Sequence, residues 1–369
     1  MNTPSALAIT LLVLGACSPN ASPLSTADSG SDVKPDAPAR ACSADAVRGI
    51  EVAQARAENP LDPIGYLPYA IRNCTLVYVA KSPSELRIRD LSLGQESVLA
   101  SADLTPRRPT IGEGFVAWEG NLNGKSVIQL SINGQTTTLS GPWDHAGEPR
   151  ASGDAVVFTA WSDVDTNSDT DVYLWARSTN AITAIATGPG QQRFADVSAT
   201  HVAVTDFSED PSGTYDPNIA KLADVVVYER SSLSKTARTL SGKQAFPRLA
   251  DNGLVVYLDW GLIHPEPKMN AYGLRIGSIT QDTSFDRNVK DDAIHNYNPH
   301  DLPSVANGRV QWVDSTADGI SMFERVLDLS APATSVLAGN LIGPAGGETM
   351  TLVGSITTSG TVELVAIAH

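Results

Sequence analysis

The 369-residue chain is poor in positive charge, cysteine and aromatic side chains. It has 26 lysine and arginine residues against 41 acidic ones, which gives a formal net charge of -15. The cations form no cluster of the kind that phosphate backbones require, which argues against nucleic acid as a partner. No apolar run reaches the ~20 residues that a membrane-spanning helix needs.

Familiar catalytic motifs are also missing. The sequence has no nucleophile elbow of the G-x-S-x-G type, no H-E-x-x-H zinc motif, no phosphate-binding loop and no dinucleotide-binding glycine fingerprint. These absences argue against the common hydrolases and nucleotide-binding enzymes. An enzyme of an unusual type stays open.

Seven short apolar strands, rich in β-branched and aromatic residues, recur along the chain. Most follow a turn that contains glycine or asparagine. The strands cover residues 76–79, 115–118, 156–159, 202–205, 255–258, 310–313 and 350–353. Such a repeat predicts stacked supersecondary units that bury one another.

A proline precedes these turns in six units, at positions 68, 109, 149, 247, 303 and 344, and Ala195 replaces it once. Proline has no N–H to donate to a sheet, so we expect it at the start of each unit's first strand. The pattern predicts an all-β propeller of four-stranded antiparallel blades over residues 42–369. Seven blades are favoured and six are the alternative. The seventh unit lacks a fourth strand, which residues 49–54 supply, so an N-terminal strand closes the last blade.

The N-terminal segment has an apolar run over residues 6–14, followed by Gly15, Ala16 and Cys17. It resembles a bacterial lipoprotein signal over residues 1–17, in which Cys17 is lipidated; an ordinary secretory signal is the alternative. Residues 18–41 are rich in serine, proline, alanine and aspartate, and we expect them to form a disordered tether. The resemblance implies the outer membrane, with the domain on the periplasmic or cell-surface side. We expect a monomer that meets the membrane only through its lipid anchor.

Once Cys17 is assigned to the lipid, Cys42 and Cys74 are the two cysteines that remain. Disulfides persist outside the cytoplasm, so we predict that these two residues pair. Two free buried thiols are the alternative. The bond would fasten the N-terminal strand to the first blade.

The repeat units also carry a family resemblance. An apolar strand, a loop and an Asp-apolar-Tyr strand, as in residues 158–161 with 171–175, resemble TolB-like propeller repeats over residues 50–369. Known TolB-like domains include periplasmic protein-binding modules. The resemblance implies a noncatalytic module that binds an envelope protein or peptide.

Oxygen-bearing side chains alternate in the loop 163–171. Calcium takes about six to eight oxygen ligands, so this spacing favours a calcium site, the one cofactor that the sequence suggests. A solvated hairpin loop is the alternative. The candidate ligands are Asp163, Asp165, Asn167, Asp169 and Asp171.

A second group of polar residues lies where the chain enters successive blades. Equivalent loops of a propeller converge at one end of its channel, so these side chains form a candidate ligand-binding ring. For each histidine, a plain surface position is the alternative. The group consists of His145, Gln192, Gln244, His295, His300 and Asp301.

Acidic residues recur after the second strand of four units, at Glu119, Asp206, Asp259 and Asp314. Their repetition predicts a structural role, such as hydrogen bonding within the hairpin. The alternative function is a propeller enzyme acting on polysaccharide, as a lyase or hydrolase, with carboxylates or a histidine or metal site at the channel mouth.

Overall fold

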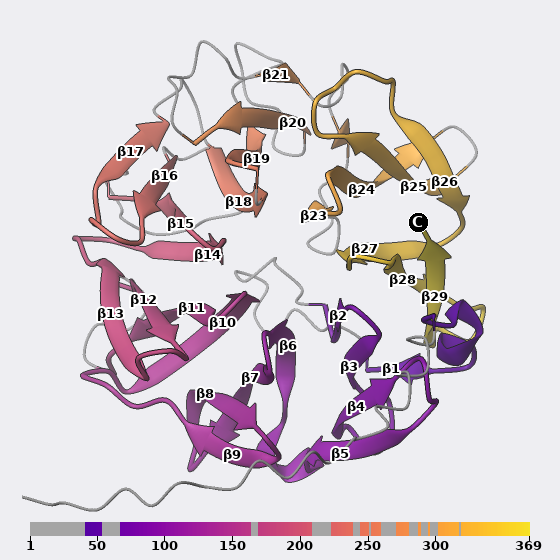
Figure 1. Ribbon diagram of the computed structural model, residues 1–369, viewed down its shortest axis with the longest axis horizontal. Helices are drawn as coiled ribbons and strands as arrows, with labels where there is room; N and C mark the ends of the chain where they lie inside the picture. The colour runs from indigo at the N-terminus through magenta and orange to yellow at the C-terminus, as the bar shows by residue number, and fades with distance from the viewer. Residues whose placement is uncertain are drawn as a thin grey trace, which may run out of the picture. The chain divides into compact units, whose positions relative to one another are not determined.

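A computed structural model shows the protein as an all-β ring of seven four-stranded antiparallel blades (Figure 1). The seven-blade prediction is therefore confirmed. Among the described residues, none of the helices is long and apolar enough to cross a membrane. The predicted signal segment 1–17 and residues 18–40 of the tether lie outside the described residues. The structure describes residues 41–53, 67–163, 169–208, 223–238, 244–250, 252–259, 271–279, 287–288, 294–295, 302–316 and 319–369.

Each blade runs outward from the axis of the ring, and consecutive strands pair as antiparallel neighbours. The innermost strands are β2 (Tyr69–Arg72), β6 (Arg107–Gly112), β10 (His145–Ser152), β14 (Gln192–Val197), β18 (Gln244–Ala250), β23 (Ser304–Ala306) and β27 (Leu341–Gly346). The second strands are β3 (Thr75–Val79), β7 (Phe115–Leu122), β11 (Ala155–Trp161), β15 (His201–Asp206), β19 (Leu254–Asp259), β24 (Arg309–Thr316) and β28 (Met350–Ile356).

The outer half of each blade completes this order. The third strands are β4 (Leu86–Asp90), β8 (Lys125–Ile132), β12 (Asp171–Ala176), β16 (Asp224–Glu229), β20 (Ala271–Ser278), β25 (Gly319–Val326) and β29 (Val362–Ala368). The fourth strands are β5 (Glu96–Ala100), β9 (Gln135–Thr138), β13 (Ala181–Ala186), β17 (Lys235–Arg238), β21 (Arg287–Asn288), β26 (Thr334–Ala338) and β1 (Glu51–Val52). A further short strand, β22 (Ile294–His295), pairs with β20, and two 3-10 turns are η1 (Ala44–Val47) and η2 (Ala102–Leu104).

The second strands carry the core, because both of their faces pack against neighbouring blades. In β11, residues 155–160 are all buried, and in β9 every residue is exposed. Side chains of adjacent blades share apolar clusters: Phe158 of β11 packs with Phe115 of β7, and Val202 of β15 packs with Val157 of β11. Burial of such side chains contributes about 1.5–3 kcal/mol each.

The ring closes between its N-terminal and C-terminal strands. The strand that residues 49–54 were predicted to supply is present as β1, and in its register against β29 Glu51 lies opposite Glu363. Cys42 and Cys74 form the expected disulfide, with their Cα atoms 5.2 Å apart. Tyr69 of the first blade adds a buried link to the seventh, since its hydroxyl accepts from the Gly354 N–H at 2.8 Å.

The prolines differ from the prediction in four blades. Pro109, Pro149, Pro247 and Pro344 lie inside the first strand rather than at its start. Pro109, Pro149 and Pro247 each lie within a β-bulge, where an extra residue interrupts the ladder, and Pro344, which lies opposite Val353, directly follows one. Proline fits there because no hydrogen bond is required of its nitrogen.

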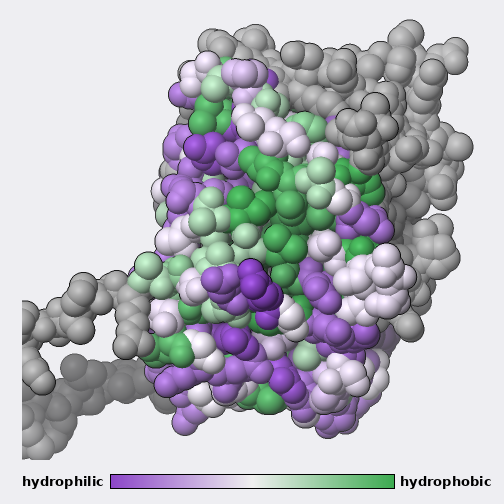
Figure 2. All heavy atoms as spheres, turned by 90° about the vertical axis from the view of Figure 1, so that its right-hand side faces the viewer, coloured by the Kyte–Doolittle hydropathy of each residue, from purple (hydrophilic) through white to green (hydrophobic). Residues whose placement is uncertain are grey.

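The outer side of the ring has a mixed surface. Figure 2 turns the right-hand side of Figure 1 toward the viewer and shows apolar residues gathered in the middle of this side, with polar residues around them. The chain here includes outer strand β26, whose residues are exposed or half-buried. The axis, in contrast, brings one strand from each blade together.

Candidate functional site

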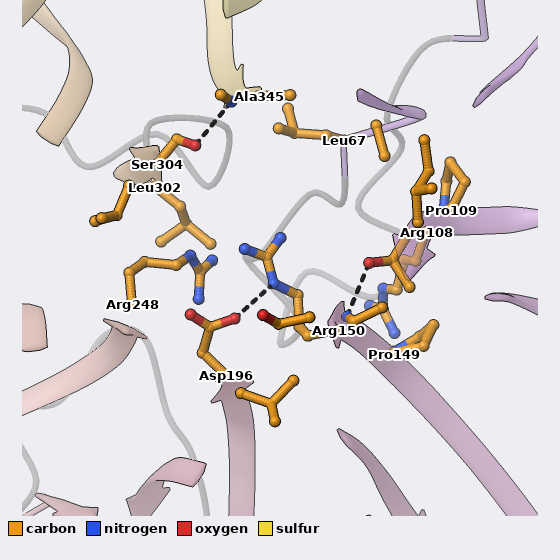
Figure 3. Close-up of a pocket in the computed structure, with 18 of the residues that line it drawn as sticks. Leu67, Arg108, Pro109, Pro149, Arg150, Asp196, Arg248, Leu302, Ser304 and Ala345 are labelled. Carbon is orange, nitrogen blue, oxygen red and sulfur yellow. Dashed lines mark hydrogen bonds and ion pairs between the residues drawn. The ribbon is translucent and has the colours of Figure 1, made fainter. Parts of the chain in front are cut away.

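A cavity of about 280 Å³ lies along the axis of the propeller and is lined by residues from all seven innermost strands or their flanks. Figure 3 shows its polar side, where Arg150, Asp196 and Arg248 point toward one another from three successive blades. Apolar groups, among them Leu67 and Leu302, complete the wall. The cavity is the candidate site because it joins charged and apolar groups in one concave space.

A repeated bulge determines which side chains reach the cavity. Arg108, Glu148, Phe194 and Phe246 each precede the proline position with a φ between 50° and 59°. This left-handed backbone is uncommon for residues other than glycine. In these four blades two residues oppose a single residue of the second strand, so the alternation of faces shifts by one place. The residue after the proline position consequently lines the cavity.

Most residues at this position link their blade to a neighbouring one. We call the linking residues the channel belt: Tyr69, Thr110, Arg150, Asp196, Arg248 and Ser304. The hydroxyl of Thr110 accepts from the Ala151 N–H at 2.9 Å, and that of Ser304 accepts from the Gly346 N–H at 2.9 Å. A short neutral side chain is thus sufficient for the link.

The charged members of the channel belt occupy the third, fourth and fifth blades. One oxygen of Asp196 accepts from the Leu249 N–H at 2.8 Å, and the other lies 3.2 Å from Nε of Arg150. Arg248 donates through Nε to the carbonyl of Pro303 at 3.1 Å. The side chain of Arg150 is 42% exposed and that of Asp196 is 11% exposed, so the guanidinium faces the cavity while the carboxylate behind it is largely covered.

Two largely buried carboxylates belong to this part of the ring: Glu148 is one of the residues that line the cavity, and Glu119 lies behind the lining residue Arg108. Burial would raise the pKa of Glu119, but the charges of Arg108 and Arg107 and a hydrogen bond from Ser126 outweigh burial and lower that pKa to about 2. Burial likewise opposes ionisation of Glu148, and the nearby charge of Arg193 reverses the effect and lowers the pKa of Glu148. Both groups are therefore ionised at neutral pH.

These contacts confirm a structural role for three of the repeated acids. Glu119 also accepts from the Glu148 N–H at 3.1 Å in the next blade. Asp206 receives the Gln192 amide at 3.3 Å, and Asp259 receives the Gln244 amide at 3.0 Å.

Three of the predicted ring residues lie elsewhere than the cavity wall. Gln192 and Gln244 are 1% and 0% exposed and point at the end of their own second strand. His145 stacks on Trp161 with ring centroids 5.4 Å apart. None of the three lines the cavity, and their role in binding stays a prediction.

The other ring residues are described only in part. His295 lies on β22, opposite Ala271 of β20. His300 and Asp301 lie outside the described residues.

Two members of the predicted calcium loop, Asp165 and Asn167, also lie outside the described residues. The carboxylate of Asp163 lies 2.6 Å from Nε2 of His145, and this hydrogen bond, together with Lys125, lowers the pKa of Asp163. The described residues contain no group of three potential metal ligands from histidine, cysteine, aspartate and glutamate. The calcium site stays a prediction.

Near the far end of this loop, burial and the adjacent charge of Asp169 raise the pKa of Asp171. The Tyr173 hydroxyl donates to Asp171 at 3.3 Å. This carboxylate is thus less readily ionised than Asp163 at the near end.

The residues that line the cavity were missed by sequence reasoning, although a signal for them exists. Thr110, Arg150, Arg248, Ser304 and Ala345 all follow the repeated proline directly. When the repeats are aligned on that proline, the next position holds charged, hydroxyl and apolar residues in different blades, and these residues line the axial cavity.

Comparisons with known proteins agree with the fold. No protein-family model and no curated protein matches the sequence. The chain is similar to the β-propeller domain of the Trilobed protease from Pyrococcus furiosus, with a TM-score of 0.59 at 11% identity, over 82% of this chain and 92% of that one. It is similar to the Pyrococcus horikoshii acylaminoacyl peptidase, with a TM-score of 0.58 at 11% identity, over 82% of this chain and 50% of that one.

TolB from Acinetobacter baumannii is also among the similar structures. Its TM-score is 0.43 at 16% identity, over 71% of this chain and 61% of that one. The chain thus spans less than two thirds of the TolB and peptidase chains. At these identities the likeness to the two Pyrococcus proteins shows the β-propeller fold alone.

Proposed function

We propose that this chain is a noncatalytic binding module of the bacterial cell envelope, which holds an envelope protein or peptide through its axial cavity. The observation that carries the proposal is the cavity itself, to which all seven blades contribute. Rigid rings with a concave mouth suit an extended ligand, because the binding groups are already in place before the ligand arrives.

The state of the carboxylates favours binding over glycan chemistry. A general acid in a glycosidase needs a pKa raised toward neutrality. The pKa of Glu119 is about 2, and the pKa of Glu148 is also lowered, because arginines lie beside both groups. An enzyme that acts on polysaccharide is the alternative function, and it requires a proton donor other than these two groups.

The location is part of the proposal. The Cys42–Cys74 disulfide suits a compartment in which disulfides persist. We propose lipidation at Cys17 and an outer-membrane position, because residues 1–17 resemble a bacterial lipoprotein signal. Mass spectrometry of the mature protein tests this: a diacylated or triacylated Cys17 is expected, and an unmodified residue there refutes the anchor.

Photo-crosslinking in native envelopes tests the binding function. A photoreactive phenylalanine analogue replaces Leu302 in the cavity wall of the full chain, and a control places it at Val98, which is 52% exposed on β5. The expected result is a discrete adduct from position 302 only. A second variant, Ala345→Trp, fills the cavity and should remove the adduct.

Two outcomes would overturn the function. One is an adduct pattern that does not differ between positions 302 and 98. The other is release of cleaved sugar from envelope polysaccharide by the purified chain, which would favour the enzyme.

A further inference from the structure

The guanidinium group of Arg150 has hydrogen-bond donors that no described residue of the chain uses. Its Nε makes the contact to Asp196 at 3.2 Å, and no hydrogen bond or ion pair to another described residue involves its Nη1 or Nη2. These two nitrogens are at the end of a side chain that is 42% exposed and points into the axial cavity. Two parallel N–H donors at the end of a guanidinium match the two oxygens of a carboxylate.

The other blades act as an internal comparison. The links between the second and third blades and between the sixth and seventh are made by Thr110 and Ser304, each with a single hydroxyl. The link between the third and fourth blades therefore does not require a side chain as large and charged as that of Arg150. Asp196 likewise does more than link its blade to the next, since one oxygen accepts from the Leu249 N–H and the other orients Arg150.

We infer that Arg150 is the centre of a carboxylate-binding site in the axial cavity, with Asp196 as its positioning residue. The inference rests on the proposed binding function and names the group that the ligand presents. The ligand carries its carboxylate on an aliphatic stem, as an acidic side chain or a chain terminus of a peptide does.

The charge of the cavity supports an anion. Its charged lining residues are three arginines against two carboxylates, which gives a net charge of +1, whereas the whole chain carries -15. The lining residues in question are Arg108, Arg150, Arg248, Glu148 and Asp196. A positive cavity in an acidic protein attracts an anionic group selectively.

The walls support an organic carboxylate rather than inorganic phosphate. Leu67, Pro109, Pro149 and Leu302 lie around the arginine in the same cavity (Figure 3). Apolar walls gain from covering an aliphatic stem, and phosphate has no such part.

Binding of small probes to the full chain tests the inference. Hexanoate supplies the carboxylate with an aliphatic stem, hexanamide is its uncharged match, and inorganic phosphate is the third probe, all titrated calorimetrically at fixed ionic strength. We expect hexanoate to bind roughly 10- to 100-fold more tightly than hexanamide, and phosphate to bind more weakly than hexanoate.

Variants then assign the binding to Arg150. Arg150→Met should reduce hexanoate affinity to that of hexanamide, and Arg150→Lys, which keeps the charge without the fork, should give an intermediate value. The matched control is Arg309→Met, because Arg309 is 37% exposed and pairs with Glu324 at 2.8 Å, away from the cavity-lining residues. This control should bind hexanoate as the wild type does. Thermal unfolding verifies that each variant is folded.

Several results would overturn the site. In the wild type these are no binding of hexanoate, equal affinity for hexanoate and hexanamide, or tighter binding of phosphate than of hexanoate. In the variants, unchanged hexanoate binding by folded Arg150→Lys or Arg150→Met would have the same meaning. Hexanoate should also compete with the adduct formed at position 302. An adduct that forms equally well in Arg150→Met leaves the binding module standing and removes the carboxylate site. Hexanoate binding that depends on Arg150, without any adduct at position 302, has the opposite meaning: the carboxylate site stands, and the proposed protein or peptide partner falls.

Discussion

The substitution Glu119→Gln should destabilise the propeller in a way that depends on pH. Glu119 is 0% exposed and lies beside Arg107 at the start of the second blade's first strand and beside Arg108 at the bulge. Its pKa is about 2 in the folded chain, against an ordinary value of 4.5. Each pKa unit corresponds to about 1.4 kcal/mol, so the ionised carboxylate contributes about 3 kcal/mol.

The sign of the pH dependence follows from this depressed pKa. The unfolded chain takes up a proton at Glu119 as the pH falls through 4.5, whereas the folded chain resists protonation until about pH 2. The stabilisation is therefore fully present above pH 4.5 and is lost between 4.5 and 2. Since glutamine resembles the protonated form, the difference between wild type and variant should be about 3 kcal/mol at pH 7 and should shrink toward zero near pH 2.

Urea unfolding followed by tryptophan fluorescence, at pH values from 7 to 2.5, measures this difference. Glu324→Gln is the matched control, because Glu324 forms a single, more exposed pair with Arg309 and should cost about 0–1 kcal/mol. The reasoning is refuted if Glu119→Gln costs less than the control at pH 7. A cost that stays constant from pH 5 to 2.5 would also refute it.

Three further predictions concern the disulfide, the Tyr69 link between the first and seventh blades, and the predicted calcium loop. Replacing Cys42 and Cys74 by serine should cost about 3–4 kcal/mol for a loop with a sequence separation of 32, measured by chemical unfolding; a cost below 1 kcal/mol would contradict the chain-entropy estimate. Tyr69→Phe leaves the buried Gly354 N–H without its acceptor and should cost about 1–3 kcal/mol in the same assay; an unchanged midpoint would show that the link contributes nothing. If the loop beginning at Asp163 holds calcium, a chelator should lower the melting temperature and added calcium should restore it, whereas a melting curve unaffected by either would rule the site out.

The sequence was sufficient to predict the ring of blades but not the residues that line the axial cavity. Short β-branched runs such as residues 156–159 and 202–205 identified the second strands correctly, because both faces of these strands are buried and their composition is distinctive. The closing strand β1 was also predictable, since the seventh unit lacked a fourth strand. Its two residues are fewer than the six that the pattern suggested.

The cavity wall was not predictable from strand alternation, for a geometric reason. A period of two assigns each side chain to a face, and one inserted residue reverses the assignment for everything after it. Gln192 and Asp196 are four places apart, as are Gln244 and Arg248, so a regular strand would put both members of each pair on the same face. The bulge between them puts them on opposite faces, and Asp196 and Arg248 line the cavity while the glutamines do not. The glutamines are buried because carboxylates at the end of the second strand accept their amide hydrogens.

The closure of the ring by β1 has a consequence for how the chain folds. The strand that contains Glu51 can pair only after the strand that contains Glu363, more than 300 residues later in the chain, has formed. Contacts at such separation are slow to form, because a very long loop must close first. The Cys42–Cys74 bond spans only 32 residues and can form as soon as the first blade is present. It would then keep β1 beside the first blade, ready to receive the last blade when the C-terminal strands are complete.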